Sequence, residues 1–171
     1  MNTVSSNSDA SAKLFALFES LKIEYRNYPH EPVMTCAAMK DLEIPAPLTK
    51  SLFLKDKKGK FWLIAALQDT KIELNTVAKV LNVGSLRFAD ETLLMNYLGV
   101  KPGAVTIFGL INDTEKMVNP IIDAEILKGE KTSFHPLHNE ATTVIASKDL
   151  IKFIEGVGRQ YRILTRKELS S

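Results

Sequence analysis

Two histidines and a glutamate lie close together in the stretch SFHPLHNEATTVI, residues 133–145. His135 and His138 are three residues apart and Glu140 follows them, so a metal site is the first chemistry to consider. Pro136 disfavours a helix between the two histidines, and in a strand residues three apart face opposite sides. Because no third clustered ligand accompanies the pair, we expect no metal site here.

Covalent catalysis is the second chemistry to consider, with Cys36 as nucleophile and His135 as base. Cys36 is the single cysteine of the chain, and a lone cysteine on the apolar side of a short helix more often packs in a core. The sequence contains no Gly-x-Ser-x-Gly elbow for a serine nucleophile and no glycine-rich loop of the Walker or dinucleotide-binding type. The residues alone therefore do not predict a nucleophilic enzyme.

Two other loci combine polar groups with restricted backbone. Lys50 directly precedes the apolar run SLFL and follows a loop stiffened by prolines, although a solvated lysine at a strand end would look the same. In GVKPGAVT, residues 99–106, two glycines let backbone N–H groups approach a ligand, or they simply make a tight turn. From the residues alone both interpretations stay open at each locus.

The elements that must position these loci follow from hydrophobic periodicity, capping residues and turn residues. The clearest is a hairpin over residues 51–67, in which the polar turn DKKGK separates two apolar strands. Its second strand, FWLIAAL, is apolar throughout and is predicted to be central in a sheet covered on both faces. Further helices are predicted at residues 12–22, 36–42, 74–81, 91–98, 124–127 and 148–155, and further strands at 23–28, 85–89, 104–111, 117–122, 131–134 and 142–146.

Length and composition limit the kind of protein. With 171 residues, 45% of them apolar, the chain is long enough for one domain with one sizeable core, and the element order predicts a mixed α/β fold with a mixed, partly barrel-like sheet surrounded by helices. We expect a frayed segment at 1–11, the domain at 12–158 and a basic tail at 159–171. The net charge of +2, the single cysteine and the lack of a signal-like or membrane-spanning stretch predict a cytoplasmic protein away from membranes.

A resemblance adds what the residues alone do not give. The segments HEPVMT (30–35), TKSLFLKD (49–56), RFAD (87–90), LGVKPGAVT (98–106) and FHPLHNEATT (134–143) occur in this order and spacing in one family. The chain resembles free-standing prolyl-tRNA editing proteins, of the superfamily that includes the editing insertion of bacterial prolyl-tRNA synthetases. Within it, the chain is most similar to the deacylase that removes alanine from mischarged tRNA(Pro). The resemblance covers about residues 12–158.

The resemblance implies hydrolysis of the ester between a wrong amino acid and the terminal adenosine of a tRNA. It implies catalytic roles for Lys50, His135 and Gly103, and it implies a substrate pocket lined by Val33, Met34, Thr35, Ser51, Ala104, Val105, Thr106 and Asn139. Two positions depart from the family pattern: Ser51 stands where asparagine is usual, and Ile107 stands where proline is usual. These departures bear on the shape of the glycine loop and on which amino acid is removed.

Such an ester is already activated, so a positioned water and charge stabilisation suffice without a covalent nucleophile. Ester hydrolysis also needs no redox group, so we expect no cofactor. We expect Lys50 to contact phosphate or carbonyl oxygen and backbone N–H groups near Gly103 to stabilise the oxyanion. His135 or the neighbouring ribose hydroxyl would orient the water. The expected partners are the acceptor end of a mischarged tRNA and prolyl-tRNA synthetase, with the chain as a monomer or weak homodimer. Two basic groups are candidate tRNA contacts, the hairpin turn near Lys50 and the tail: Lys55, Lys57, Lys58 and Lys60, and Arg159, Arg162, Arg166 and Lys167.

Two alternatives remain. The chain could deacylate tRNA mischarged with another small amino acid, serine or cysteine, or it could bind a tRNA end or nucleotide without turnover as a partner of a synthetase. A synthetase pocket built for proline cannot strongly exclude the smaller alanine, because a missing methylene is worth only about 1 to 3 kcal/mol. A second site must therefore reject proline by size, and Val33, Met34 and the glycine loop are the candidates for that sieve.

Overall fold

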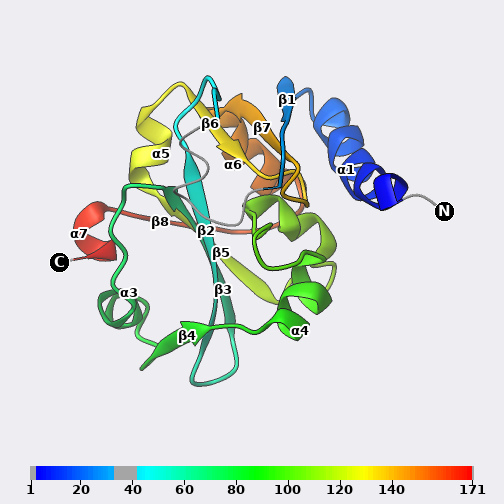
Figure 1. Ribbon diagram of the computed structural model, residues 1–171. Helices are drawn as coiled ribbons and strands as arrows, with labels where there is room; N and C mark the ends of the chain where they lie inside the picture. The colour runs from blue at the N-terminus through cyan, green and yellow to red at the C-terminus, as the bar shows by residue number, and fades with distance from the viewer. Residues whose placement is uncertain (1–2, 33–41, 171) are drawn as a thin grey trace.

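The structure is a computed structural model of the chain and describes residues 3–32 and 42–170. Figure 1 shows helices packed around two groups of strands. In chain order the elements are α1 (Thr3–Ser20), β1 (Tyr25–Pro29), β2 (Thr49–Asp56), β3 (Phe61–Leu67), α3 (Leu74–Leu81), β4 (Leu86–Phe88), α4 (Glu91–Leu93), the π-helix η1 (Leu94–Leu98), the 3-10 helix η2 (Ile107–Asn112), β5 (Val118–Asp123), α5 (Ala124–Lys128), β6 (Lys131–Phe134), β7 (Ala141–Ala146), α6 (Ser147–Gly156), β8 (Arg162–Leu164) and α7 (Arg166–Leu169).

The strands of the described residues form two sheets. Strands β1, β7 and β6 make an antiparallel sheet in that order, and the other sheet has the order β4-β2-β3-β5-β8. The second sheet is mixed, because β3 pairs with β5 in parallel and β5 with β8 in parallel, while β2 is antiparallel to both β3 and β4. The mixed α/β class is therefore confirmed. The expected single, partly barrel-like sheet is instead two sheets, and neither of them closes into a barrel.

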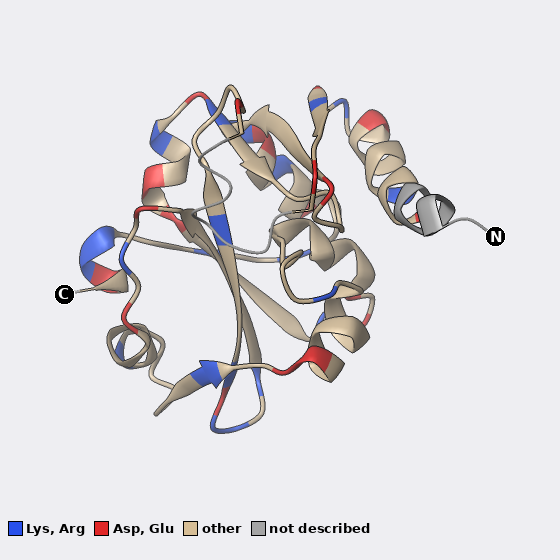
Figure 2. Ribbon diagram, in the orientation of Figure 1, with Lys and Arg blue, Asp and Glu red and all other residues tan. Residues whose placement is uncertain are grey.

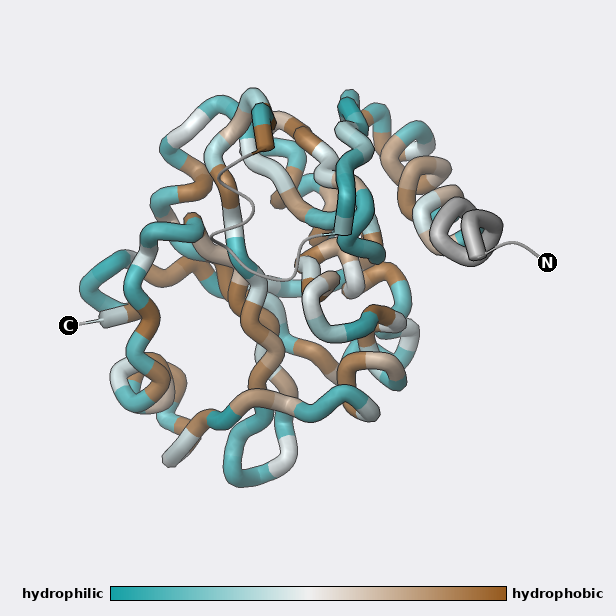
Figure 3. Tube along the Cα trace, viewed as in Figure 1, coloured by the Kyte–Doolittle hydropathy of each residue, from teal (hydrophilic) through white to brown (hydrophobic). Residues whose placement is uncertain are grey.

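Strand β3 is buried on both faces, as its uninterrupted apolar sequence predicts. Its alternate side chains enter two different cores, because successive residues of a strand point to opposite faces. Phe61, Leu63 and Ala65 join the larger core, to which α1, η1, η2 and α6 also contribute. Trp62, Ile64 and Ala66 join a smaller core closed by α3 and α7. Hydrophobic segments accordingly run through the central strands in Figure 3.

The turn between β2 and β3 is held by a buried carboxylate. Asp56 accepts hydrogen bonds from Lys58 N at 2.8 Å, Lys60 N at 3.0 Å and Trp62 Nε1 at 3.0 Å. Burial acts to raise the pKa of Asp56, but these bonds from Trp62 and the backbone outweigh it and the pKa lies below its ordinary value. Gly59 takes the positive φ of 88° that the turn needs, so the predicted hairpin is confirmed.

One predicted strand is wrong. Residues 104–111, AVTIFGLI, do not join a sheet; from Ile107 they form the 3-10 helix η2, and Thr106 caps it by accepting a hydrogen bond from Phe108 N at 3.2 Å. The segment is apolar on every side because it lies deep in the larger core, and an apolar run without periodicity does not distinguish strand from helix. Gly109 allows η2 to pack on η1, since a Cβ there would lie 2.9 Å from Leu98 Cβ.

Both ends of the chain take part in the fold. The backbone is helical from Thr3 onward, within the segment 1–11 that the sequence marks as frayed, and Ser11 Oγ donates to Pro136 O at 2.8 Å. At the other end, Arg159 is buried and forms an ion pair with Asp113 Oδ2 at 2.5 Å. Arg159 is thus unavailable to RNA, contrary to the expected role of the basic tail, whereas the boundaries of the domain stay a prediction. No helix in the described parts of the chain is long and apolar enough to span a membrane.

Candidate active site

A small pocket lies where the start of β2 meets the end of β6. It is lined by Thr49, Lys50, Ser51, Val105, Ser133, Phe134, His135 and Thr142. Two hydrogen bonds tie its walls together: Thr49 Oγ1 donates to Ser133 O, and Ser133 Oγ donates to Pro47 O at 2.9 Å. The structure therefore brings together Lys50, Ser51, Val105 and His135, four residues that the family resemblance had placed in one site.

The ammonium group of Lys50 is held by a buried hydrogen-bond network. Lys50 Nζ donates to Thr70 O at 2.6 Å, and Thr70 Oγ1 donates to Asp123 Oδ2 at 2.5 Å. Asp123 is fully buried, accepts from Leu67 N at 3.1 Å, and caps α5 by accepting from Glu125 N at 3.0 Å. An ammonium has three donors, so the bond to Thr70 leaves donors with which Lys50 can reach a substrate oxygen. Sequence reasoning missed Thr70 and Asp123.

His135 lines this pocket with a neutral imidazole ring. Its Nδ1 lies 2.9 Å from Ala141 O, and since a carbonyl only accepts, Nδ1 carries the proton and Nε2 keeps its lone pair. Burial lowers the pKa of His135 below 6.5; the nearby His30 and His138 lower it further, while the bond to Ala141 opposes them. An imidazole with a free Nε2 can accept a proton or a hydrogen bond from water or from a ribose hydroxyl.

A second histidine, His30, contacts two residues of the pocket lining, His135 and Thr142. Its ring centroid lies 6.2 Å from that of His135, and its Nε2 lies 2.8 Å from Thr142 Oγ1. In the neutral ring of His30 the proton is on Nδ1, which faces Glu31 O at 2.8 Å, and the Thr142 hydroxyl then donates to Nε2. The lone pairs of Thr142 Oγ1 are then left to accept a hydrogen bond from a substrate. The motif HEPVMT begins with His30, yet no local pattern distinguishes it from the other two histidines.

The glycine loop contributes one residue to the pocket lining, Val105. Gly103 has a positive φ of 87°, and Ala104 N donates to Lys101 O at 3.0 Å, so the N–H of Ala104 is occupied within the turn. No hydrogen bond joins the N–H of Val105 to another group in the parts of the chain that the structure describes. Of these two N–H groups, only that of Val105 is therefore left open to a further acceptor among the described residues. Ile107 takes the first position of η2, a position at which proline is also favourable. Isoleucine in place of the family's usual proline therefore leaves the start of η2 unchanged.

The remaining predicted residues lie elsewhere. Val33, Met34, Thr35 and Cys36 lie outside the described residues. Thr106 is fully buried as the cap of η2, and Asn139 is half-buried and does not line the pocket. The hairpin lysines are not near Lys50: Asp56 is six residues along β2 from Lys50, about 20 Å at the rise of a strand, and Figure 2 shows the turn's blue segments at the far end of the sheet.

The chemistry available in the pocket suits hydrolysis of an activated ester. Lys50 supplies a cation, Val105 a backbone donor, Nε2 of His135 a base and Thr142 a hydroxyl acceptor. Residues 3–32 and 42–170 contain no cluster of three or more histidine, cysteine, aspartate or glutamate side chains that could hold a metal ion. His138, the other half of the histidine pair, is half-buried and accepts from Glu140 N at 3.1 Å, so its Nδ1 is engaged locally.

Comparison with known proteins identifies the family. Residues 30–153 match the aminoacyl-tRNA editing domain. The chain is 34% identical to the prolyl-tRNA editing protein ProX of Acetoanaerobium sticklandii, an alignment that covers 91% of this chain and 97% of that protein. It is 37% identical to prolyl-tRNA synthetase associated domain-containing protein 1 of Mus musculus, over 92% of this chain and 96% of that protein.

Solved structures agree with this assignment at the level of the fold. A candidate trans-editing enzyme for prolyl tRNA synthetase superposes with a TM-score of 0.69 at 16% identity, covering 91% of this chain and 95% of that chain. A second structure, of the hypothetical protein APE2540, gives a TM-score of 0.70 at 17% identity over 88% and 96% of the two chains. The sequence matches span most of the chain and the fold is shared, and the chain belongs to the aminoacyl-tRNA editing domain family.

Proposed function

We propose that this protein edits tRNA in trans by hydrolysing the ester of mischarged tRNA(Pro), with alanyl-tRNA(Pro) as its main substrate. The observation that carries the proposal is that Lys50, His135 and Val105 line one pocket although they are 30 to 85 residues apart in the chain. The names of the bacterial and mouse relatives, which refer to prolyl-tRNA editing and to prolyl-tRNA synthetase, support the choice of tRNA(Pro).

In the proposed mechanism the pocket binds the terminal aminoacyl-adenosine and water attacks the ester carbonyl. Lys50 neutralises charge on a phosphate or on the carbonyl oxygen, and the N–H of Val105, placed by the turn at Gly103, stabilises the oxyanion. His135 Nε2 accepts a hydrogen bond from the water or from the adjacent ribose hydroxyl and holds it in line. The water oxygen bonds to the carbonyl carbon and the bond from that carbon to the ribose oxygen breaks. A proton of the water passes, through His135 Nε2 or the adjacent ribose hydroxyl, to the departing ribose oxygen, which leaves as a free hydroxyl without a covalent intermediate.

Ser51, Thr142 and Ser133 give the pocket a polar wall that can face the amino group of the substrate. Ser133 Oγ donates to Pro47 O and Thr142 Oγ1 donates to His30, so both oxygens keep lone pairs for an ammonium group. Rejection of proline by size, by Val33, Met34 and the glycine loop, remains part of the proposal, as do roles for Thr35, Ala104, Thr106 and Asn139.

The partner of the site is tRNA. We further propose docking on prolyl-tRNA synthetase, a monomer or weak homodimer, and a cytoplasmic location. Lys55, Lys57, Lys58 and Lys60 stay candidates for a weaker contact with tRNA at a distance from the pocket. Their turn is a pronounced local concentration of positive charge, which attracts RNA backbone in a salt-dependent way.

The testing experiment incubates the purified protein with alanyl-, seryl-, cysteinyl- and prolyl-tRNA(Pro) and records which esters disappear, with the Lys50→Ala protein in parallel. We expect alanyl-tRNA(Pro) to be hydrolysed fastest and prolyl-tRNA(Pro) to stay intact. The Lys50→Ala protein should hydrolyse neither ester. Faster hydrolysis of the serine or cysteine ester would change the substrate but keep the reaction. If no ester were lost, the protein would instead be a binding module for the tRNA end.

A further inference from the structure

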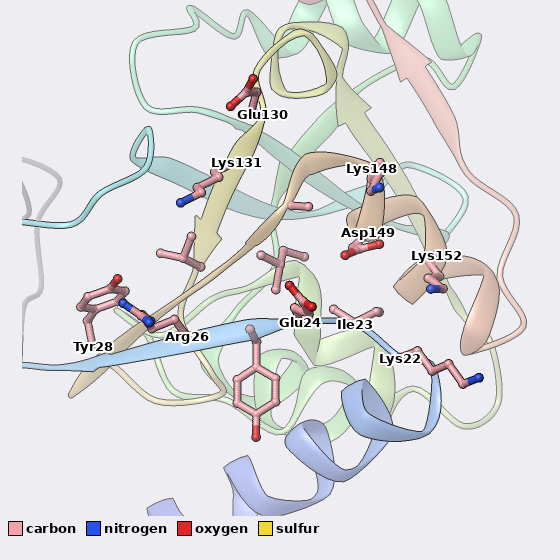
Figure 4. Close-up of a pocket in the computed structure, with 14 residues that line it drawn as sticks. Lys22, Ile23, Glu24, Arg26, Tyr28, Glu130, Lys131, Lys148, Asp149 and Lys152 are labelled. Atoms are coloured by element: carbon pink, nitrogen blue, oxygen red, sulfur yellow. The ribbon is translucent and has the colours of Figure 1, made fainter.

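A larger groove lies on the three-stranded sheet, beside the candidate active site. Its lining comes from β1 and the residues before it, from β6 and β7, and from the first turns of α6: Lys22, Ile23, Glu24, Tyr25, Arg26, Tyr28, Glu130, Lys131, Val144, Ile145, Ala146, Lys148, Asp149 and Lys152. Figure 4 shows Arg26, Tyr28 and Lys131 at one end of the groove and Lys22, Lys148 and Lys152 at the other.

The register of the sheet makes the groove and the pocket one continuous surface. Directly paired residues of an antiparallel sheet have their side chains on the same face. Arg26 is paired with Val144, which is paired in turn with Ser133. Arg26 and Val144 line the groove, whereas Ser133 lines the pocket. The surface therefore passes from groove to pocket within a single row of the sheet.

A second row repeats this arrangement. Tyr28 is paired with Thr142; Tyr28 lines the groove and Thr142 lines the pocket. Along β7, the four steps from Thr142 to Ala146 extend this surface by about 13 Å at the rise of a strand. A polymer whose terminal unit occupied the pocket would thus pass over Tyr28 and Arg26 and continue along the groove.

The charge of the groove indicates which kind of polymer it can bind. Five of the 22 basic residues and three of the 20 acidic residues line it, which leaves 17 of each sign elsewhere and places the entire net charge of +2 here. Its five basic side chains are all exposed, and none of them has an ion-pair partner among the described residues. Exposed unpaired cations along a groove, with an aromatic ring at the end next to the pocket, are features that bind single-stranded RNA.

We propose that this groove binds the phosphodiester backbone of the tRNA strand that leads to the esterified adenosine, with Arg26 and Lys131 contacting the phosphates nearest the pocket. The proposal rests on the proposed function, because it assumes that the terminal adenosine occupies the pocket. Tyr28 lies at the junction and offers its ring to a base. The hairpin lysines are not needed for this path, since they lie at the far end of β2.

The test compares the double variant Arg26→Glu/Lys131→Glu with a matched control, Lys79→Glu/Lys116→Glu, whose two lysines are exposed and do not line the groove. Both variants change the net charge equally. The groove variant is expected to raise KM for alanyl-tRNA(Pro) about 10-fold or more, with the loss in KM rather than in kcat. The slope of log KM against log salt should fall by about 1.4, or 0.7 for each lost phosphate contact. The loss should vanish with alanyl-adenosine, which has no phosphate.

An unchanged KM in the groove variant, or an equal rise in the control, would overturn the proposal. The milder pair Arg26→Gln/Lys131→Gln serves if charge reversal lowers the thermal unfolding midpoint. Should the wild-type protein hydrolyse no ester, the proposed function fails, and binding of uncharged tRNA(Pro), followed by fluorescence anisotropy, still decides on the groove. In that assay weaker binding by the groove variant alone supports the groove, and equal binding by all three proteins refutes it.

Discussion

Replacing Asp123 with asparagine should lower activity through Lys50, although Asp123 does not line the pocket. The carboxylate of Asp123 receives hydrogen bonds from Leu67 N, Thr70 Oγ1 and Glu125 N, and the carbonyl of Thr70 holds Lys50 Nζ. Asparagine keeps one acceptor oxygen and turns an NH2 group toward donors, so part of this network is lost. The turn at residues 67–70 should shift, and the ammonium of Lys50 should shift with it.

The magnitude follows from the bonds. Hydrogen bonds to a charged group contribute about 1.5 to 3 kcal/mol each, so we expect Asp123→Asn to lower the free energy of unfolding by about 2 to 3 kcal/mol. A domain of ordinary stability, about 5 to 15 kcal/mol, stays folded after that loss. A catalytic group displaced by about 1 Å can cost up to about 100-fold in rate, and we expect kcat/KM for alanyl-tRNA(Pro) to fall by about 10- to 100-fold.

The decisive assay is a double-mutant cycle with Lys50→Ala. If Asp123 acts through Lys50, Asp123→Asn should change kcat/KM little when Lys50 is already absent. An equal loss in both backgrounds would show that Asp123 does not act through Lys50. Asp56→Asn is the matched control: Asp56 is also a buried carboxylate with three hydrogen bonds at a turn, and it has no bond to Lys50 or its partners. Asp56→Asn should lower the free energy of unfolding, measured with urea, by about as much as Asp123→Asn does, and it should leave kcat unchanged.

Three further outcomes follow from the structure. Because the pKa of His135 is lowered, its imidazole stays neutral as the pH falls through 6.5, and the rate of single-turnover deacylation should decline only below that pH. His135→Gln should remove this decline, whereas a decline in rate with its midpoint above pH 6.5 would contradict the role of His135. Arg159→Met should lower the free energy of unfolding by about 3 to 5 kcal/mol, because it leaves Asp113 buried without its partner, and a loss under 1 kcal/mol would contradict this. Gly109→Ala should lower the free energy of unfolding by about 1 to 3 kcal/mol through the clash with Leu98, and it should reduce activity by moving η2. Gly129→Ala, where the added Cβ makes only ordinary contacts, should lower the free energy of unfolding little. Equal unfolding midpoints for the two variants would argue against tight packing at Gly109.

Local sequence patterns predicted the elements that have clear periodicity or turn residues. The hairpin around Gly59 and the central position of β3 were predictable, because uninterrupted apolar character requires burial on both faces. The segment at 104–111 was not, since its burial hides the 3.6-residue or two-residue period on which assignment depends. The division of the strands into two sheets depends on long-range pairing that no local pattern records.

The site shows the same limit. Motifs shared with a family pointed to Lys50, Val105 and His135, which line the pocket, but they gave no sign that Thr70 and Asp123 hold Lys50. Asp123 lies 73 residues from Lys50, and its only local signal is that of a helix cap before α5. Likewise, the arginine at 159 looked like part of a basic tail because its partner Asp113 is 46 residues away.

Selectivity is the property that most defines the proposed enzyme: the pocket should hydrolyse the alanyl ester of tRNA(Pro) and spare the prolyl ester. Its most direct measurement is a single-turnover competition, in which alanyl-tRNA(Pro) and prolyl-tRNA(Pro) carrying different isotopes are mixed with excess protein and the release of each amino acid is followed in the same tube. If the pocket discriminates as proposed, alanine is released well above the spontaneous rate and proline is released at the spontaneous rate. Release of both amino acids at the same accelerated rate, or of neither, would contradict it.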